Sequence, residues 1–325
     1  MTPILEAKHL VKTFATTGRQ LFSSNGFTAV RNVSFTVMPG EIFGIVGESG
    51  SGKSTVARML MCLEPLTEGE VHFDGNRIDN MSPQKLRSLR PQFQMVFQDS
   101  GTTLNPRKRI GDILRETMLH HGICPPEEID ERIDTLLADV GLGTNVRNRY
   151  PHEFSGGQRQ RICIARALSL SPRLLILDDP VSALDVSIQA QILNLLQELQ
   201  EKNNLTYLFI SHGLGAVRYI SHRIAVMYRG EIVETGNCED IFSHPAHPYT
   251  RALIDAVPSV ETSIRPKMML QGEINDSIRE GTCPLLHRCP MAGPRCSSYT
   301  GEPITLSEPS HISLCTRALE DTADA

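Results

Sequence analysis

The chain has 325 residues, of which 40% are apolar, and its formal net charge is −5. This length predicts two domains, or one large domain with an appendage, around a sizeable core. No run of 18 apolar residues exists, so we expect no membrane-spanning helix, and the negative charge argues against broad electrostatic binding to nucleic acid. The N-terminus lacks the basic and apolar segments of a secretory signal, so the eight cysteines favour reduced thiols or metal ligands over disulfides.

The first ninety residues indicate short strands around one glycine-rich loop. Strands are expected at 29–37, 42–46 and 70–73, and a helix follows the loop from Thr55 onward. The loop fits the phosphate-binding pattern G-x-x-x-x-G-K-[ST] at every fixed position, and it lies between a strand and a helix as that pattern requires. Its residues are Gly47, Glu48, Ser49, Gly50, Ser51, Gly52, Lys53 and Ser54.

The loop predicts a site for a nucleotide with Mg²⁺. Its glycines allow backbone N–H groups to crowd around a polyphosphate, and the following helix N-terminus adds positive charge. Lys53 is expected to reach the β- and γ-phosphates, and the Ser54 hydroxyl is expected to bind Mg²⁺. The alternative, a glycine-rich turn that binds nothing, is disfavoured by the strand–loop–helix context.

The rest of the chain alternates helices with strands, which predicts an α/β core with a largely parallel sheet. Helical periodicity runs from about 105 to 165 and again through 188–199. Short strands are expected at 174–177 and 205–210, followed by a hairpin of 224–228 with 231–234. Asp178 ends the first of these strands, where an acid is expected to organise Mg²⁺.

Residues 154–161 begin with Phe-Ser-Gly-Gly-Gln and resemble the signature sequence of the ATP-binding cassette (ABC) ATPases. Other elements follow in that family's order, and the resemblance covers roughly residues 3–255. Gln98 resembles the Q-loop glutamine, residues 182–185 (Ser-Ala-Leu-Asp) the D-loop ending at Asp185, His212 the switch histidine, and Phe14 the aromatic residue that stacks on adenine.

The resemblance implies a P-loop NTPase cassette with a RecA-like core, an antiparallel β subdomain and a helical subdomain at about 100–165. It also implies a head-to-tail dimer, because in the family the signature contacts the γ-phosphate of ATP held by the opposite subunit. The residues expected to do so are Ser155, Gly156, Gly157 and Gln158. By the same resemblance His212 donates a hydrogen bond to the γ-phosphate, and Gln98 contacts the metal and the attacking water.

Two departures from the family pattern concern hydrolysis. Asp179 stands where the family usually has the glutamate that orients water, and Gly213 stands where it usually has aspartate. An aspartate is one methylene shorter, so its carboxylate lies about 1 Å further from the water, and such a displacement can cost on the order of 100-fold in rate. We therefore expect secure ATP binding, weak hydrolysis at this chain's own site, and a hetero-dimer with a second cassette.

The C-terminal part, residues 256–325, is expected to be a small lobe with little core of its own, which follows an ATP-binding domain at 1–255. Before it, residues 244–253 contain His-Pro-Tyr, and this segment and residues 104–107 resemble the oligopeptide/dipeptide importer ATPases. Four cysteines, Cys283, Cys289, Cys296 and Cys315, are spaced as in the lobe of that subfamily, whose members can hold a [4Fe–4S] cluster. Zinc and unligated thiols remain alternatives, although paired C-x₂-C knuckles typical of structural zinc are missing.

The resemblance implies an ATPase that energises import of di- or oligopeptides. Its expected partners are a second cassette, two transmembrane permeases and an extracytoplasmic solute-binding protein, at the cytoplasmic face of the inner membrane. Nickel or another small solute is an alternative cargo, and a hydrolysis-poor regulatory cassette is an alternative role. A soluble ABC ATPase acting on DNA or ribosomes is disfavoured by the single cassette, the absence of sustained heptads and the net charge.

Overall fold

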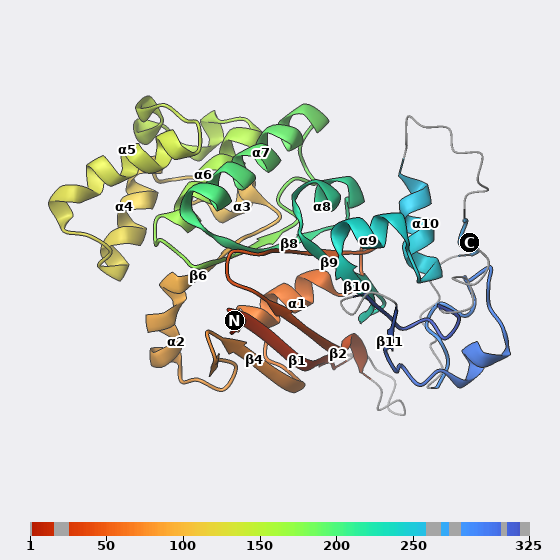
Figure 1. The fold of residues 1–325 in the computed structure, drawn as a ribbon. Helices are drawn as coiled ribbons and strands as arrows, with labels where there is room; N and C mark the ends of the chain where they lie inside the picture. The colour runs from red at the N-terminus through yellow and green to blue at the C-terminus, as the bar shows by residue number, and fades with distance from the viewer. Residues whose placement is uncertain (1, 16–25, 258–267, 273–280, 307–310, 319–325) are drawn as a thin grey trace.

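The computed structural model describes residues 2–15, 26–257, 268–272, 281–306 and 311–318. A small antiparallel sheet has the strand order β2-β1-β4-β5, and a larger sheet has the order β11-β12-β10-β9-β3-β8-β7-β6 (Figure 1). The strands of the small sheet are β1 (Leu5–Phe14), β2 (Phe27–Val37), β4 (Glu68–Phe73) and β5 (Asn76–Arg77). Those of the large sheet are β3 (Ile42–Val46), β6 (Phe93–Val96), β7 (Leu174–Asp178), β8 (Thr206–Ser211), β9 (Arg223–Tyr228), β10 (Glu231–Asn237), β11 (Ile304–Thr305) and β12 (Ile312–Ser313).

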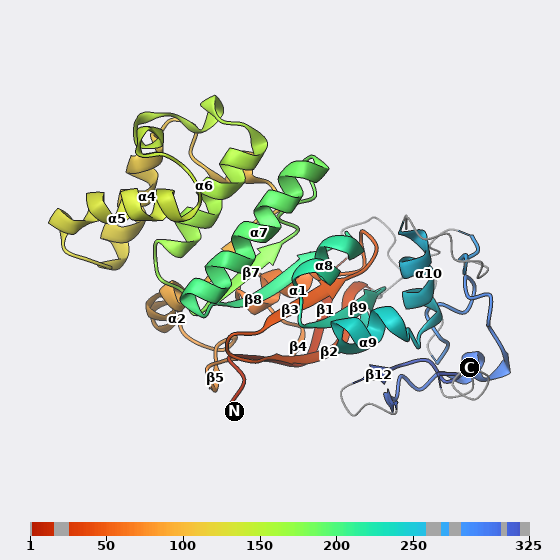
Figure 2. The same ribbon diagram turned by 45° about the horizontal axis from the view of Figure 1, so that its top comes forward.

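Helices cover both faces of the large sheet, and α1 lies between the two sheets (Figure 2). The α-helices are α1 (Lys53–Leu60), α2 (Pro83–Leu89), α3 (Ser100–Thr103), α4 (Ile110–His121), α5 (Ile129–Asp139), α6 (Gly156–Leu168), α7 (Val186–Asn203), α8 (Leu214–Ile220), α9 (Cys238–Ser243) and α10 (Pro248–Ala256). Short 3-10 turns occur at Arg90–Gln92, Pro126–Glu128, Thr144–Asn148, Pro151–Glu153 and Pro294–Ser298. In the described residues no helix is both long enough and apolar enough to cross a membrane.

Strand β3 consists of a run of apolar residues, rather than alternating apolar and polar ones, because it lies between two hydrophobic cores. Phe43 and Ile45 pack into the core that contains α1, whereas Ile42 and Val46 pack into the core shared with α7 and α8. A strand covered on both faces buries every side chain, and each large apolar side chain contributes about 1.5–3 kcal/mol. This arrangement confirms the α/β class. The strands β6, β7, β8, β3 and β9 are parallel, as the sequence predicts, whereas β10, β12 and β11 extend the sheet with antiparallel pairings.

The register of the parallel strands brings their C-terminal ends to one edge. Val46 of β3 pairs with Ser211 of β8, and Asp178 of β7 pairs with Ile210 of β8. The segments that follow β3, β7 and β8 therefore leave the sheet side by side. They carry the phosphate-loop pattern, Asp179 and His212.

The four-cysteine part of the chain is attached to the large sheet, which the sequence pattern did not predict. Strand β12 pairs antiparallel with β10, and β11 continues the sheet beyond it. The buried carboxylate of Glu234 on β10 accepts hydrogen bonds from the backbone N–H groups of Ala246 and His247, and it lies 2.7 Å from Nε2 of His311. The strand pairing, the Glu234–His311 contact and the burial of Leu285 in the large core attach this part to the cassette.

Candidate nucleotide-binding site

The phosphate-loop segment has a backbone that only glycine fits at several positions. Gly50 and Gly52 have φ angles of +80° and +102°, in the left-handed region. A Cβ atom on Gly47 would lie 2.0 Å from the carbonyl oxygen of Met227. The loop therefore runs close to β9 and turns directly into α1, so that backbone N–H groups at the helix N-terminus face the cleft.

Lys53 is folded back on its own loop. Its ammonium group donates hydrogen bonds to the carbonyl oxygens of Gly47 and Glu48, at 2.7 and 2.8 Å, and to Oγ of Ser51 at 3.2 Å. Burial lowers the pKa of Lys53, while the nearby carboxylates of Asp179, Asp178 and Glu48 act in the opposite direction. A triphosphate in the cleft would supply charge-assisted acceptors in exchange for these carbonyl bonds.

Ser54 and Asp178 form a pair that suits Mg²⁺. The Ser54 hydroxyl donates to Oδ1 of Asp178 at 2.9 Å, and Asp178 as a whole is 4% exposed. Burial raises the pKa of Asp178, and the hydrogen bond from Ser54 opposes that rise. Mg²⁺ prefers such oxygen ligands together with phosphate oxygens and water.

Asp179 is held by two groups at the end of β8. Its Oδ1 accepts a hydrogen bond from the Ser211 hydroxyl at 3.0 Å, and its Oδ2 lies 2.7 Å from Nδ1 of His212. The residue has a φ angle of +51°, which Asp tolerates better than most residues. The carboxylate and the imidazole thus form one unit at the sheet edge, with the His212 side chain 54% exposed toward the cleft.

These groups line one open cleft of about 460 Å³. The sequence-predicted residues that line it are Phe14, Ser49, Gly50, Gly52, Lys53, Ser54, Thr55, Gln98, Asp178, Asp179 and His212. Sequence reasoning missed Phe27, which also lines the cleft and pairs across the strands with Phe14. Both rings are exposed, so the cleft offers two aromatic surfaces for a base, and only the pairing of β1 with β2 reveals the second.

The signature residues do not line this cleft. Ser155 caps α6, accepting a hydrogen bond from the Gln158 N–H, while the Gln158 side chain accepts from the Ser155 N–H. Gly157 packs tightly on α7, because a Cβ atom there would lie 2.5 Å from Ile188. Asp185 is exposed at the start of α7. The helix N-terminus at Ser155 is therefore open to a second molecule.

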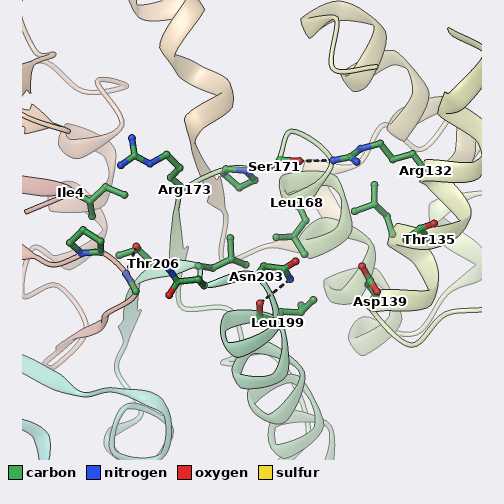
Figure 3. A pocket seen from close by; sticks show the side chains of 16 residues that line it. Ile4, Arg132, Thr135, Asp139, Leu168, Ser171, Arg173, Leu199, Asn203 and Thr206 are labelled. Carbon is green, nitrogen blue, oxygen red and sulfur yellow. Dashed lines mark hydrogen bonds between the residues drawn. The ribbon is translucent and has the colours of Figure 1, made fainter. Parts of the chain in front are cut away.

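A second cavity, of about 540 Å³, lies at the opposite edge of the sheet (Figure 3). It opens beside the N-terminal ends of β7 and β8, between Ile4 and helix α5. Its charged groups are already paired: Arg132 donates to Ser171, Arg173 binds Asp74, and Asp139 binds Lys202. It has no glycine-rich loop, so the cleft at the C-terminal edge is the better nucleotide site.

The four cysteines converge on one small cavity of about 20 Å³, which His247 and Tyr299 also line. None of the four forms a disulfide bond. Burial raises the pKa of Cys283 to about 12; a hydrogen bond from Leu285 opposes the rise, and the three neighbouring thiols add to it. No group of three or more Cys, His, Asp or Glu in the described part of the chain is arranged to hold a single metal ion.

Comparisons with known proteins place the chain in a family. The family model "ABC transporter" matches residues 30–182, and the model "Oligopeptide/dipeptide transporter, C-terminal region" matches residues 233–296. The oligopeptide transport ATP-binding protein AppF of Bacillus subtilis is 49% identical over 292 residues, which cover 88% of each chain. The chain belongs to the ATP-binding proteins of ABC transporters. Members of this family are ATPases that are coupled to transport. This chain is therefore an ATPase of that kind.

Other relatives and solved structures support the same family. The glutathione import ATP-binding protein GsiA of Escherichia coli is 50% identical over 270 residues, which are 82% of this chain but only 43% of that protein. The dimeric structure of a bacterial ABC transporter cassette superposes with a TM-score of 0.65 at 29% identity, covering 72% of this chain and 98% of that one. The same cassette in a post-hydrolysis state with ADP and phosphate gives 0.64.

We expect Lys53→Ala to weaken MgATP binding by about 10- to 100-fold, the loss typical of hydrogen bonds to charged groups. The measurement is a calorimetric titration of the purified chain with MgATP. Lys202→Ala is the matched control, because that exposed lysine pairs with Asp139 at the other sheet edge. Equal ATP affinity in the Lys53 variant and the wild type would remove the phosphate-loop assignment.

Proposed function

We propose that this chain energises the import of di- or oligopeptides as one of two cassettes of a membrane transporter. One observation supports this proposal most strongly. A single chain contains both the proposed ATP cleft and a segment that matches the C-terminal region of oligopeptide and dipeptide transporters. The relatives named for oligopeptides and for glutathione, itself a small peptide, support this cargo class. Nickel or another small solute remains the alternative cargo.

We propose a role for each group in the cleft. Phe14, together with Phe27, stacks on adenine, and Lys53 with the loop amides binds the β- and γ-phosphates. Ser54, Asp178 and Gln98 would hold Mg²⁺, which would supply positive charge beside the phosphates. Asp179 orients the attacking water, and His212 donates to the γ-phosphate.

The position of the signature supports a head-to-tail dimer. Ser155 and the N-terminus of α6 are exposed and lie outside the chain's own cleft, so they are free to complete the cleft of a second cassette. We propose that this second cassette is a different chain that carries glutamate where this one has Asp179. Two permeases and a solute-binding protein complete the importer, and this chain lies at the cytoplasmic face of the inner membrane.

Purification of the complex through this chain should yield two permeases and a second cassette. In proteoliposomes supplied with the solute-binding protein, we expect ATP-dependent uptake of labelled di- or oligopeptides, and Lys53→Ala should reduce it. Uptake of nickel without uptake of peptides would show that the cargo is nickel and not di- or oligopeptides. A chain that copurifies with no membrane protein would overturn the importer proposal itself.

We expect Asp179→Glu to raise ATP turnover of the assembled complex, by up to about 100-fold at this site, because it restores about 1 Å of reach toward the water. Asp139→Glu is the control, because it adds the same methylene far from the cleft and should leave the rate of ATP turnover unchanged. The measurement is phosphate release at saturating MgATP. A fall in rate would mean that the left-handed backbone and the bonds to Ser211 and His212 are adapted to aspartate, and the asymmetry argument would fail.

We also propose a [4Fe–4S] cluster at Cys283, Cys289, Cys296 and Cys315. Four thiols that line one cavity are the donor set such a cluster needs. Cluster thiolates bind separate irons and stand further apart than four thiolates around one zinc ion at about 2.3 Å. Because the cavity holds about 20 Å³, the cysteine side chains must turn outward to admit the cluster.

Protein purified without oxygen should be brown and contain about four irons per chain. Cys283→Ser should lose most of the iron, whereas Cys124→Ser, which alters a cysteine in the loop between α4 and α5, should retain it. Iron content and the visible spectrum are the readouts. Colourless protein with one zinc per chain would assign zinc, and metal-free protein with an ordered C-terminal part would leave the four thiols unligated.

A further inference from the structure

We infer that Arg288 is a positioning residue of the ATP site, which it controls through Glu48 of the phosphate loop. Its two terminal nitrogens donate to the two carboxylate oxygens of Glu48, at 3.0 and 3.3 Å. The two residues are 240 positions apart in the sequence. This fork-to-fork pairing is the strongest geometry available to an arginine and a carboxylate.

The pair is shielded from water. The Arg288 side chain is 14% exposed and that of Glu48 is 30% exposed. Arg288 also donates to the Tyr228 hydroxyl at 3.3 Å, and its guanidinium lies 5.9 Å from the centre of that ring. A partly buried ion pair with this geometry is screened less by salt than a surface pair and constrains both partners more firmly.

Glu48 is bound at each of its polar groups. Its N–H donates to the Tyr249 hydroxyl at 2.8 Å, and Tyr249 is fully buried against Tyr228, with ring centres 4.5 Å apart. Its carbonyl oxygen accepts from Lys53, and its carboxylate accepts from Arg288. The second residue of the loop is thus held by Tyr249 of α10 and by Arg288 of the cysteine-bearing segment, both far from it in the sequence.

Charge explains why this clamp matters for nucleotide binding. Glu48 lies in the loop that binds a highly negative triphosphate, so an uncompensated carboxylate there repels the ligand. Arg288 balances that charge and draws the carboxylate away from the cleft, toward Tyr228. Arg288 lies one residue before Cys289, with its backbone N–H bonded to the Leu285 carbonyl, so the cysteine-bearing segment itself supplies the compensating charge.

The inference rests on ATP binding at the phosphate loop and predicts a charge-dependent rescue. In the full-length chain, Arg288→Gln should raise the Kd for MgATP on the order of tenfold, because a nearby unit charge is left unbalanced. The same change made in a chain that already carries Glu48→Gln should alter the Kd by less than about twofold. The penalty of Arg288→Gln should also shrink in high salt.

Two further variants separate positioning from general stability. Arg288→Lys keeps the charge without the fork, and its Kd should lie between those of the wild type and Arg288→Gln. Arg173→Gln is the matched control, since it breaks a two-bonded pair with Asp74 far from the cleft and should leave the Kd unchanged. Thermal melting without nucleotide is measured for every variant.

Wild-type affinity in Arg288→Gln, or equal losses from that change with and without Glu48→Gln, would overturn the inference. If Arg288→Gln alone does not fold, Arg288→Lys takes its place. Its Kd for MgATP is then compared, by the same criterion, with the Kd of the wild type and of the double variant that carries Arg288→Gln and Glu48→Gln. A loss of affinity in Arg288 variants combined with full affinity in Lys53→Ala would instead point to a nucleotide site elsewhere.

Discussion

The parallel register of β3, β7 and β8 is the constraint on which the site depends. Because Val46 lies beside Ser211 and Asp178 beside Ile210, three chain segments end at one sheet edge. That edge gathers the glycine-rich loop, the Ser54–Asp178 pair and the Asp179–His212 pair within one cleft. The buried strands stabilise this register, since a slip of one residue would exchange the side chains facing the two cores.

A second constraint comes from the C-terminal part, which is built onto the cassette instead of standing apart. Glu234 anchors the backbone before α10 and contacts His311, while β12 extends the sheet. Arg288 of the same part contacts Glu48 of the phosphate loop, whose N–H also donates to Tyr249 on α10. Nucleotide binding and the four-cysteine cavity therefore share one structural support, although they are far apart in the sequence.

Local sequence patterns predicted the elements that carry the chemistry, because each depends on neighbouring residues. The phosphate loop, the strand ending at Asp178 and the capped helix after Ser155 are all of this kind. Contacts between distant segments were not predictable in this way. The pairing of Phe27 with Phe14, the strand β12 and the link from Arg288 to Glu48 each require the three-dimensional arrangement.

The account is tested most directly by a crystal structure of the chain with Mg²⁺ and a non-hydrolysable ATP analogue. It predicts the triphosphate on the loop of residues 47–54, the base against Phe14 and Phe27, and the metal between the Ser54 hydroxyl and Asp178. Nucleotide bound in the cavity beside Arg132 and Arg173, at the opposite sheet edge, would contradict it. So would a metal that contacts neither Ser54 nor Asp178.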